Sequence, residues 1–236
     1  MISAIVVSGG SGSRMKSDMP KQYLELNGKP VLYYALKAFQ DSCVDEIVIV
    51  AGSNYLDFCQ KEIVEKYALD KVVSIVEGGK ERYHSVYEGL KAVNDKCESV
   101  LIHDGARPLL TNEIIEKSIE SVKKDKACIV GVPVKDTIKV IDELGYADAT
   151  LDRATLWQVQ TPQTFDYVLI DEAYKKVFDD MAQGKDVPTI TDDAMIIEYA
   201  SDKKVRMIHG DYRNIKVTTP EDMGVAELFL KNSKKI

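Results

Sequence analysis

The sequence predicts a doubly wound α/β fold, in which helices cover both faces of a mainly parallel sheet to give three layers. Two observations lead to this prediction. Short apolar runs with few charges and little alternation recur along the chain, and segments of helical period lie between them. Such runs are typical of strands that are buried on both faces of a parallel sheet. Strands that alternate with helices then form a β-α-β series.

The strands of this sheet are predicted where β-branched and other apolar residues cluster. These segments are residues 4–8, 46–51, 72–76, 100–103 and 128–132. Helices are predicted where apolar residues recur three or four positions apart, and these segments are 31–39, 58–67, 114–122, 166–181 and 192–200. The later runs VRMIHG and NIKV are predicted to be strands. A last helix is expected at Thr219, with Pro220 at its first position and acidic residues in its first turn.

The stretch 136–157 does not follow this alternation of buried strands and helices. Polar and apolar residues alternate along it, and Glu143, Leu144 and Gly145 give a turn signal between two short strands. We therefore predict a β-arm that protrudes from a single domain spanning residues 1–236. Because an isolated hairpin is marginally stable in water, we expect the arm to pack on the same arm of a second subunit and to form a homodimer.

Composition excludes several classes of protein. A formal net charge of -7 disfavours binding to a nucleic-acid backbone, which calls for a basic excess. No apolar run approaches the ~18 residues that cross a bilayer, and the N-terminal segment lacks the features of a signal peptide. The expected location is the cytoplasm. The cysteines lie far apart without metal-ligand spacing, so we expect them to be reduced core residues: Cys43, Cys59, Cys97 and Cys128.

A glycine-rich loop, SGGSGSRM, follows the first predicted strand. Its glycines would lie at the carboxyl end of a parallel sheet, where α/β proteins bind ligands, and would let backbone N–H groups approach phosphate oxygens. The loop matches neither the dinucleotide-binding pattern nor a P-loop, and a plain strand-to-helix turn is the alternative. Arg14 and Lys21, seven residues apart, add two cations to the loop. They favour a nucleoside triphosphate held between Ser8 and Lys21.

A second motif, HDGARP, follows the buried strand at 100–103 and places Asp104 and Arg107 at the same edge of the sheet. An aspartate there is able to hold a ribose hydroxyl or a magnesium ion, which takes one or two carboxylates together with substrate phosphates. The alternative is an ion pair between Asp104 and Arg107 within a turn. His103 is expected to be a core residue.

Several motifs in succession resemble 2-C-methyl-D-erythritol 4-phosphate cytidylyltransferases. The motifs are GGSGSRM, PKQYLELNGKPVLYY, HDGARP, VKDTIK, LDRATLWQVQTPQTF, TITDDA and NIKVTTPED, in family order from residue 9 to residue 222. The resemblance implies a Rossmann-like nucleotidyltransferase fold. It also implies the transfer of CMP from CTP to a sugar-alcohol phosphate in non-mevalonate isoprenoid synthesis, with magnesium, in a homodimer whose β-arms interlock.

The resemblance also assigns roles to residues. Arg14 and Lys21 match the family's transition-state cations, and Lys216 is assigned a catalytic role beside them. The family usually has two alanines where Ser8 and Gly9 stand here. The residues assigned to CTP are Ser8, Gly9, Gly10, Gly12, Gly79, Ser85, Asp104 and Gly105, and Asp104 is also the candidate magnesium ligand. The residues assigned to the acceptor are Arg107, Thr137, Arg153, Thr161 and Thr191, with Arg153 acting on the partner subunit's site.

The absence of a Ser-His-Asp, Cys-His or paired-carboxylate motif agrees with this chemistry. The attacking phosphate monoester is mostly dianionic at neutral pH, with a second pKa of about 6, so no general base is required and cations supply the catalysis. Three other functions remain open at this stage. They are ribitol-5-phosphate cytidylyltransferase, which has a similar loop, a nucleotide-dependent dehydrogenase, and a non-catalytic nucleotide-binding protein.

Overall fold

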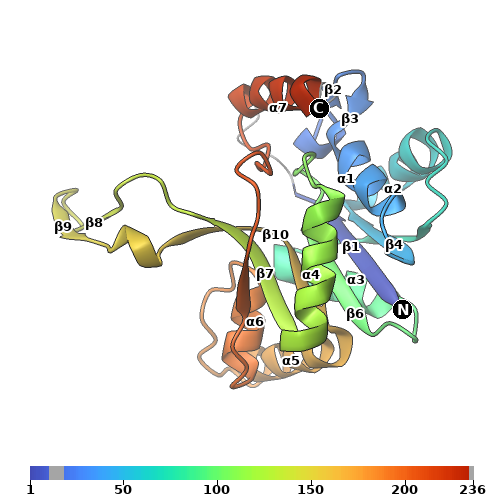
Figure 1. Cartoon of the computed structure of the whole chain (residues 1–236). Helices are drawn as coiled ribbons and strands as arrows, with labels where there is room; N and C mark the ends of the chain where they lie inside the picture. The colour runs from blue at the N-terminus through green and yellow to red at the C-terminus, as the bar shows by residue number, and fades with distance from the viewer. Residues whose placement is uncertain (11–18, 234–236) are drawn as a thin grey trace.

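The structure, a computed structural model, describes residues 1–10 and 19–233 and confirms the predicted fold class. A central sheet is flanked by helices on both faces (Figure 1). Its strands lie in the order β11-β7-β10-β6-β1-β4-β5. Their bounds are β1 Ile2–Ser8, β4 Glu46–Ala51, β5 Val72–Glu77, β6 Ser99–Asp104, β7 Ala127–Pro133, β10 Trp157–Asp166 and β11 Arg206–His209.

The sheet is mainly parallel, as predicted, with one antiparallel strand. β10 runs antiparallel to β6 and β7, whereas the other neighbouring strands are parallel. The sequence does not predict β10, because polar residues occupy its buried middle. Trp157, assigned to the arm from the sequence, is the first residue of β10. The buried polar residues of this strand are Gln160, Thr161, Gln163 and Thr164.

The helices divide between the two faces of the sheet. One face is covered by α1, the π-helical turn η4 and α4, and the other by α3, α5 and α6. Helix α7 packs on the small hairpin of β2 and β3 in a third apolar cluster. The bounds are α1 Val31–Gln40, α2 Leu56–Phe58, η4 Cys59–Glu65, α3 Arg82–Ala92, α4 Asn112–Asp125, α5 Tyr167–Ala182, α6 Asp193–Ala200, α7 Pro220–Ser233, β2 Glu25–Leu26 and β3 Lys29–Pro30.

Side-chain caps explain where several helices begin. Asp166 accepts a hydrogen bond from the N–H of Leu169 at 3.3 Å, and Asp192 accepts one from the N–H of Met195 at 3.1 Å. Such caps satisfy N–H groups that have no partner within the first turn of a helix. At α7 the cap comes from inside the first turn, where Asp222 accepts the N–H of Thr219 at 2.8 Å.

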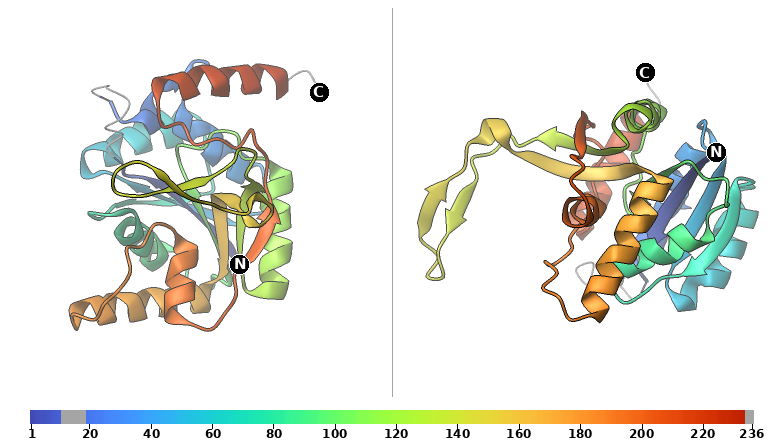
Figure 2. Two further views of the ribbon diagram at one scale, coloured as in Figure 1. Left: turned by 90° about the vertical axis from the view of Figure 1, so that its left-hand side faces the viewer. Right: turned by 90° about the horizontal axis from the view of Figure 1, so that it is seen from below.

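The structure confirms the predicted hairpin. Strands β8 (Lys139–Ile141) and β9 (Ala147–Thr150) pair antiparallel and stand away from the body of the molecule (Figure 2). The carboxylate of Asp142 closes the turn by accepting the N–H groups of Leu144 and Tyr146, each at 2.9 Å. Gly145 has a φ of 86°, a left-handed conformation that favours glycine.

Two expectations are wrong. The run NIKV forms no strand, because Val217 donates its N–H to the carbonyl of Ala106 in the loop after β6 and not to a neighbouring strand. Cys43 is exposed, whereas the other three cysteines are buried, and all four are free thiols. Within the ranges 1–10 and 19–233, no helix has the length and apolar character needed to cross a membrane.

Candidate active site

A cavity of about 310 Å³ opens at the carboxyl edge of the sheet, where β1 and β6 end. Parallel α/β sheets bind ligands at this edge. Several predicted residues meet there although they are far apart in the sequence: Ser8, Gly9, Gly10, Lys21, Gly79, Ser85, Asp104 and Lys216. The sequence does not single out the other lining residues, which are Val7, Gln22, Lys80, Glu81, Arg82, Ala106 and Thr218.

Gln22 and Tyr23 anchor the start of the glycine-rich loop. The buried Gln22 amide donates to the carbonyl of Ser8 and, at 3.1 Å, to the carbonyl of Gly10. The hydroxyl of Tyr23 donates to the same Ser8 carbonyl at 3.2 Å. The loop therefore leaves β1 with its first carbonyls bound to protein groups. The predicted residues Gly12 and Arg14 lie outside the described residues.

Gly79 lies in the turn before α3, and Ser85 lies in the first turn of that helix. The N–H of Gly79 donates to the Ser85 hydroxyl at 3.1 Å. A Cβ atom at Gly79 would lie 2.4 Å from the Cβ of His84, so the position requires glycine. His84 is half-buried and accepts the N–H of Glu81 in the cap of α3. The turn thus presents backbone groups and one hydroxyl to the cavity.

Asp104 is the centre of a cluster of positive charges. Its carboxylate lies 2.9 Å from the Lys216 ammonium, 3.1 Å from Nε of Arg82 and 3.6 Å from Nε of Arg107. The Asp104–Arg107 pair considered from the sequence is therefore present, but it is the longest of the three contacts. Burial would raise the pKa of Asp104, yet the charges of Arg82, Lys216 and Arg107 hold that pKa well below its usual range. The carboxylate is ionised in this site.

Hydrogen bonds beneath Asp104 fix its backbone. The N–H of Asp104 donates to the Thr161 hydroxyl at 3.1 Å, and that hydroxyl lies 3.0 Å from Nδ1 of His103. His103 is fully buried, as expected for a core residue, and its Nε2 lies 3.1 Å from the carbonyl of Arg107. Thr161, assigned to the acceptor, does not line the cavity, because its hydroxyl is used inside the fold.

Gly105 and Arg107 shape the loop after β6 without lining the cavity. A Cβ atom at Gly105 would lie 2.8 Å from Cδ1 of Leu32, and its N–H donates to the carbonyl of Val7 at 2.8 Å. Arg107 donates from Nη1 to the carbonyl of Asn214 at 2.8 Å. This bond ties the loop after β6 to the segment that carries Lys216.

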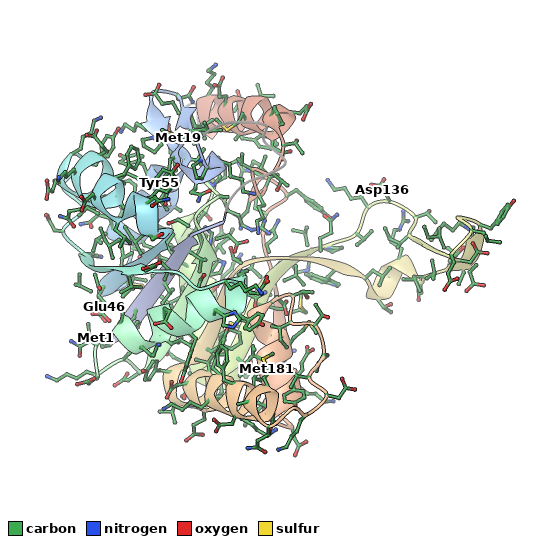
Figure 3. All side chains as sticks on the ribbon, turned by 180° about the vertical axis from the view of Figure 1, so that it is seen from behind. Met1, Met19, Glu46, Tyr55, Asp136 and Met181 are labelled. Atoms are coloured by element: carbon green, nitrogen blue, oxygen red, sulfur yellow. The ribbon has the colours of Figure 1, made fainter. Side chains whose placement is uncertain are left out.

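Three residues assigned to the acceptor lie away from the cavity of their own chain. Thr137 and Arg153 are exposed on the arm, where Arg153 donates to the carbonyl of Lys135 at 2.7 Å. Figure 3 shows Asp136, next to Thr137, out on the arm and clear of the body. Thr191 is exposed before α6 and contacts the sulfur of Met195. One chain therefore does not bring these residues to its own site.

The charge and position of Asp104 fit a magnesium ion. It is an ionised carboxylate on the cavity wall, and Mg²⁺ is usually held by one or two carboxylates with phosphate oxygens and water. Across the part of the chain that the structure describes, no group of three or more His, Cys, Asp or Glu side chains is arranged to hold a metal. Substrate phosphates and water would therefore supply most of the ligands.

A model of the family described as 2-C-methyl-D-erythritol 4-phosphate cytidylyltransferase matches residues 2–232. The chain belongs to this family. It is 50% identical over 234 residues to the cytidylyltransferase of Alkaliphilus oremlandii, covering 99% of this chain and 96% of that one. It is 48% identical over 233 residues to the enzyme of Lachnospira eligens, covering 98% and 100% of the two chains.

Solved structures of the cytidylyltransferase family have the same fold. The chain is similar to the crystal structure of 4-diphosphocytidyl-2C-methyl-D-erythritol synthase from Anaerococcus prevotii, with a TM-score of 0.83 and 38% identity, covering 98% of this chain and 96% of that one. It is also similar to the cytidylyltransferase of Thermus thermophilus, with a TM-score of 0.75 and 25% identity, covering 96% and 98%. The match to the cytidylyltransferase family thus extends over almost the whole chain.

Proposed function

We propose that the chain transfers CMP from CTP to 2-C-methyl-D-erythritol 4-phosphate. The products are 4-diphosphocytidyl-2-C-methyl-D-erythritol and pyrophosphate, in the non-mevalonate route to isoprenoid precursors. The observation that carries this proposal is the family match over residues 2–232. The cavity at the carboxyl edge of the sheet supports it, because it gathers a glycine-rich loop and cationic side chains in one place.

The reaction is an in-line displacement at the α-phosphorus of CTP. An oxygen of the acceptor's phosphate forms the new bond to this phosphorus, while the bond from the α-phosphorus to the bridging oxygen of the β-phosphate breaks. The electron pair of that bond leaves with pyrophosphate. Because the attacking oxygen is already deprotonated near neutral pH, the protein has to hold two polyanions together and to balance the charge that develops.

Cationic side chains have this task in our proposal. Lys21 and Lys216 line the cavity, and the Lys216 side chain is 39% exposed, so its ammonium is accessible to a ligand. Arg14 would act with them. Removal of one such contact costs on the order of 10²–10³ in rate. Gly79 and Ser85 line the same cavity and would contact the cytosine.

We propose that the reaction uses magnesium and that Asp104 holds the ion directly or through water. When bound, the ion would neutralise the triphosphate and make pyrophosphate a better leaving group. Asp104 supports this role by its ionised carboxylate on the cavity wall. Glu81, the other acidic residue that lines the described cavity, accepts the N–H of His84 in the cap of α3.

We also propose a homodimer that forms through the arm. The apolar side chains of Ile141, Leu144 and Tyr146 are 66%, 82% and 71% exposed, which is costly for a hairpin in water. An arm that reaches a partner would bury them and would bring Thr137 and Arg153 to the partner subunit's acceptor site. The four free thiols support a reducing compartment such as the cytoplasm.

Pyrophosphate release by the purified protein tests the proposal. With CTP and Mg²⁺ at equal acceptor concentrations, we expect release with 2-C-methyl-D-erythritol 4-phosphate and at least 10²-fold slower release with D-ribitol 5-phosphate, because pockets built around substrate hydroxyls reject poor matches strongly. Faster release with the ribitol compound would move the chain to polyol phosphate metabolism. No release with either would contradict cytidylyl transfer to these acceptors.

A further inference from the structure

A charged network extends from Asp104 into the protein, away from the cavity. Arg82 is the first residue of α3 and joins two carboxylates from distant parts of the chain. Its Nε lies 3.1 Å from Asp104, and its Nη2 lies 2.8 Å from Asp193 at the start of α6. Two nitrogens of one planar guanidinium are thereby held by two different partners, which fixes the orientation of Arg82.

The far end of the network is fully buried. Asp193 is 0% exposed and does not line the cavity. Its second carboxylate oxygen accepts the hydroxyl of Tyr174 at 2.7 Å, and its backbone N–H donates to the Gln163 side chain at 2.8 Å. Asp193 is thus placed by contacts from α5 and β10. Asp193 is out of reach of a substrate in the cavity, and its direct contact with a residue that lines the cavity is the ion pair with Arg82.

In the proposed reaction, Asp104 has to keep its position while Lys216 moves, and the network serves this requirement. Lys216 is bound to Asp104 at 2.9 Å in this structure, yet it would also have to meet substrate phosphate. When Lys216 shifts toward phosphate, Asp104 loses the shortest of its three ion pairs, and a buried carboxylate then depends more on the cations that remain. Arg82 is held in place from behind, because its other contact is to the buried Asp193.

We propose that Arg82 is a positioning residue, oriented by Asp193 and Tyr174, that holds Asp104 in its working geometry while Lys216 turns from Asp104 to substrate phosphate. The proposal rests on the proposed function and adds a role for Asp193 and Tyr174, which do not line the cavity. It also links the two halves of the site, since Asp193 begins the helix that follows Thr191, whereas Asp104 ends β6 on the nucleotide side.

The isosteric change Asp193→Asn tests this role. It keeps the size of the side chain and its ability to bond Tyr174 but removes the charge that orients Arg82. We expect kcat with CTP and 2-C-methyl-D-erythritol 4-phosphate to fall about 10²-fold, as for a lost electrostatic contact. The affinity for CTP alone, measured by calorimetry, should change less than fivefold, because the loop and the turn at Gly79 remain intact.

Asp180→Asn is the matched control. Asp180 is also buried, bonds a tyrosine hydroxyl at 3.1 Å and pairs with two lysines, but it lies on α5 and does not line the cavity. We expect its kcat to stay within twofold of the wild-type value. Arg82→Lys should recover part of the activity lost in Arg82→Met, because one ammonium is able to pair with one carboxylate but not to bridge both.

Folding is checked by thermal melting, and Tyr174→Phe provides a milder test if Asp193→Asn does not fold. That variant loses one hydrogen bond to Asp193, and we expect kcat to fall three- to tenfold. The positioning role would be overturned if Asp193→Asn folds and its kcat lies within twofold of the Asp180→Asn value. If Asp193→Asn does not fold, the same result for a folded Tyr174→Phe would overturn it. Absence of pyrophosphate release by the wild-type protein would instead contradict the proposed function itself.

Discussion

At the scale of single residues, the hydrogen bonds below Asp104 determine which ring nitrogen of His103 carries the proton. The carbonyl of Arg107 only accepts, so Nε2 of His103 carries the hydrogen and Nδ1 accepts from the Thr161 hydroxyl. The Thr161 oxygen is then free to accept the N–H of Asp104. A second proton on His103 would face the Thr161 hydroxyl and break this order. The neutral imidazole is therefore part of the support of the site.

The pH dependence of stability should reveal this neutral histidine. Burial lowers the pKa of His103 from 6.5 to about 4. As the pH falls through this interval, the unfolded chain binds a proton that the folded chain does not, so the contribution of His103 is complete above pH 6.5 and is lost toward pH 4. Between pH 7.5 and 4.5, the loss in free energy of unfolding should be roughly 2 kcal/mol greater in the wild type than in His103→Gln.

Urea unfolding of both proteins across this pH range measures the difference. Carboxylates that titrate in the same range affect both proteins alike, so the difference between the two curves isolates His103. Parallel curves for the wild type and His103→Gln would mean that His103 titrates normally in the folded protein.

Sequence patterns predict the residues of this site that sit in motifs and miss those that act through distant contacts. Asp104 and Lys216 stand in recognisable motifs, and both line the same cavity. Arg82 lies in the charged stretch GGKERYH, which resembles a solvated surface. Its partners Asp104 and Asp193 are 22 and 111 residues away, a separation that no local pattern reports. Gln22 had a weak signal, since it directly follows Lys21.

At the scale of elements, strands and helices with apolar periodicity are predicted well, and elements that bury polar groups are not. β4 is predicted with its exact bounds, because all of its residues are buried and mostly apolar. β10 is missed, because Gln160, Thr161 and Gln163 sit in the sheet and make hydrogen bonds in place of apolar contacts. Helix α3 has a weak apolar face and begins at a cap, so its pattern is faint.

The arm is the element with the clearest prediction for assembly. Replacing Ile141, which is 66% exposed on β8, with aspartate should weaken the dimer on the order of 10²-fold, because a symmetric contact loses the same apolar side chain twice. Val168→Asp is the matched control, since Val168 is 59% exposed on α5, in the body of the molecule. Sedimentation equilibrium measures both variants. An unchanged dissociation constant for Ile141→Asp would argue against a dimer built on this face of the arm.

At the scale of the whole molecule, the sheet order explains why one small cavity contains residues from most of the chain. β1 and β6 are neighbours and end at the same edge, and the segment before α7 is tied to the loop after β6. The sequence predicts the α/β class and the parallel majority of the sheet. It does not predict the strand order or the antiparallel β10, because these depend on pairing between distant segments.

The charge distribution is also a property of the whole molecule. The chain carries a formal net charge of -7, yet Lys21, Lys80, Arg82 and Lys216 all line the cavity. A local group of cations in an acidic protein favours the approach of polyanionic substrates to one place. This distribution agrees with a small phosphorylated substrate and with cytidylyl transfer as the central chemistry.

The fate of the α-phosphorus of CTP tests that central chemistry most directly. The protein is incubated with 2-C-methyl-D-erythritol 4-phosphate and CTP labelled with ³²P at either the α- or the γ-position. We predict that the α-label appears in the organic diphosphate product and that the γ-label appears in pyrophosphate. A γ-label in the organic product would show phosphoryl transfer, and an α-label that remains with unreacted CTP or free CMP would show that no cytidylyl group is transferred; either result would contradict the account.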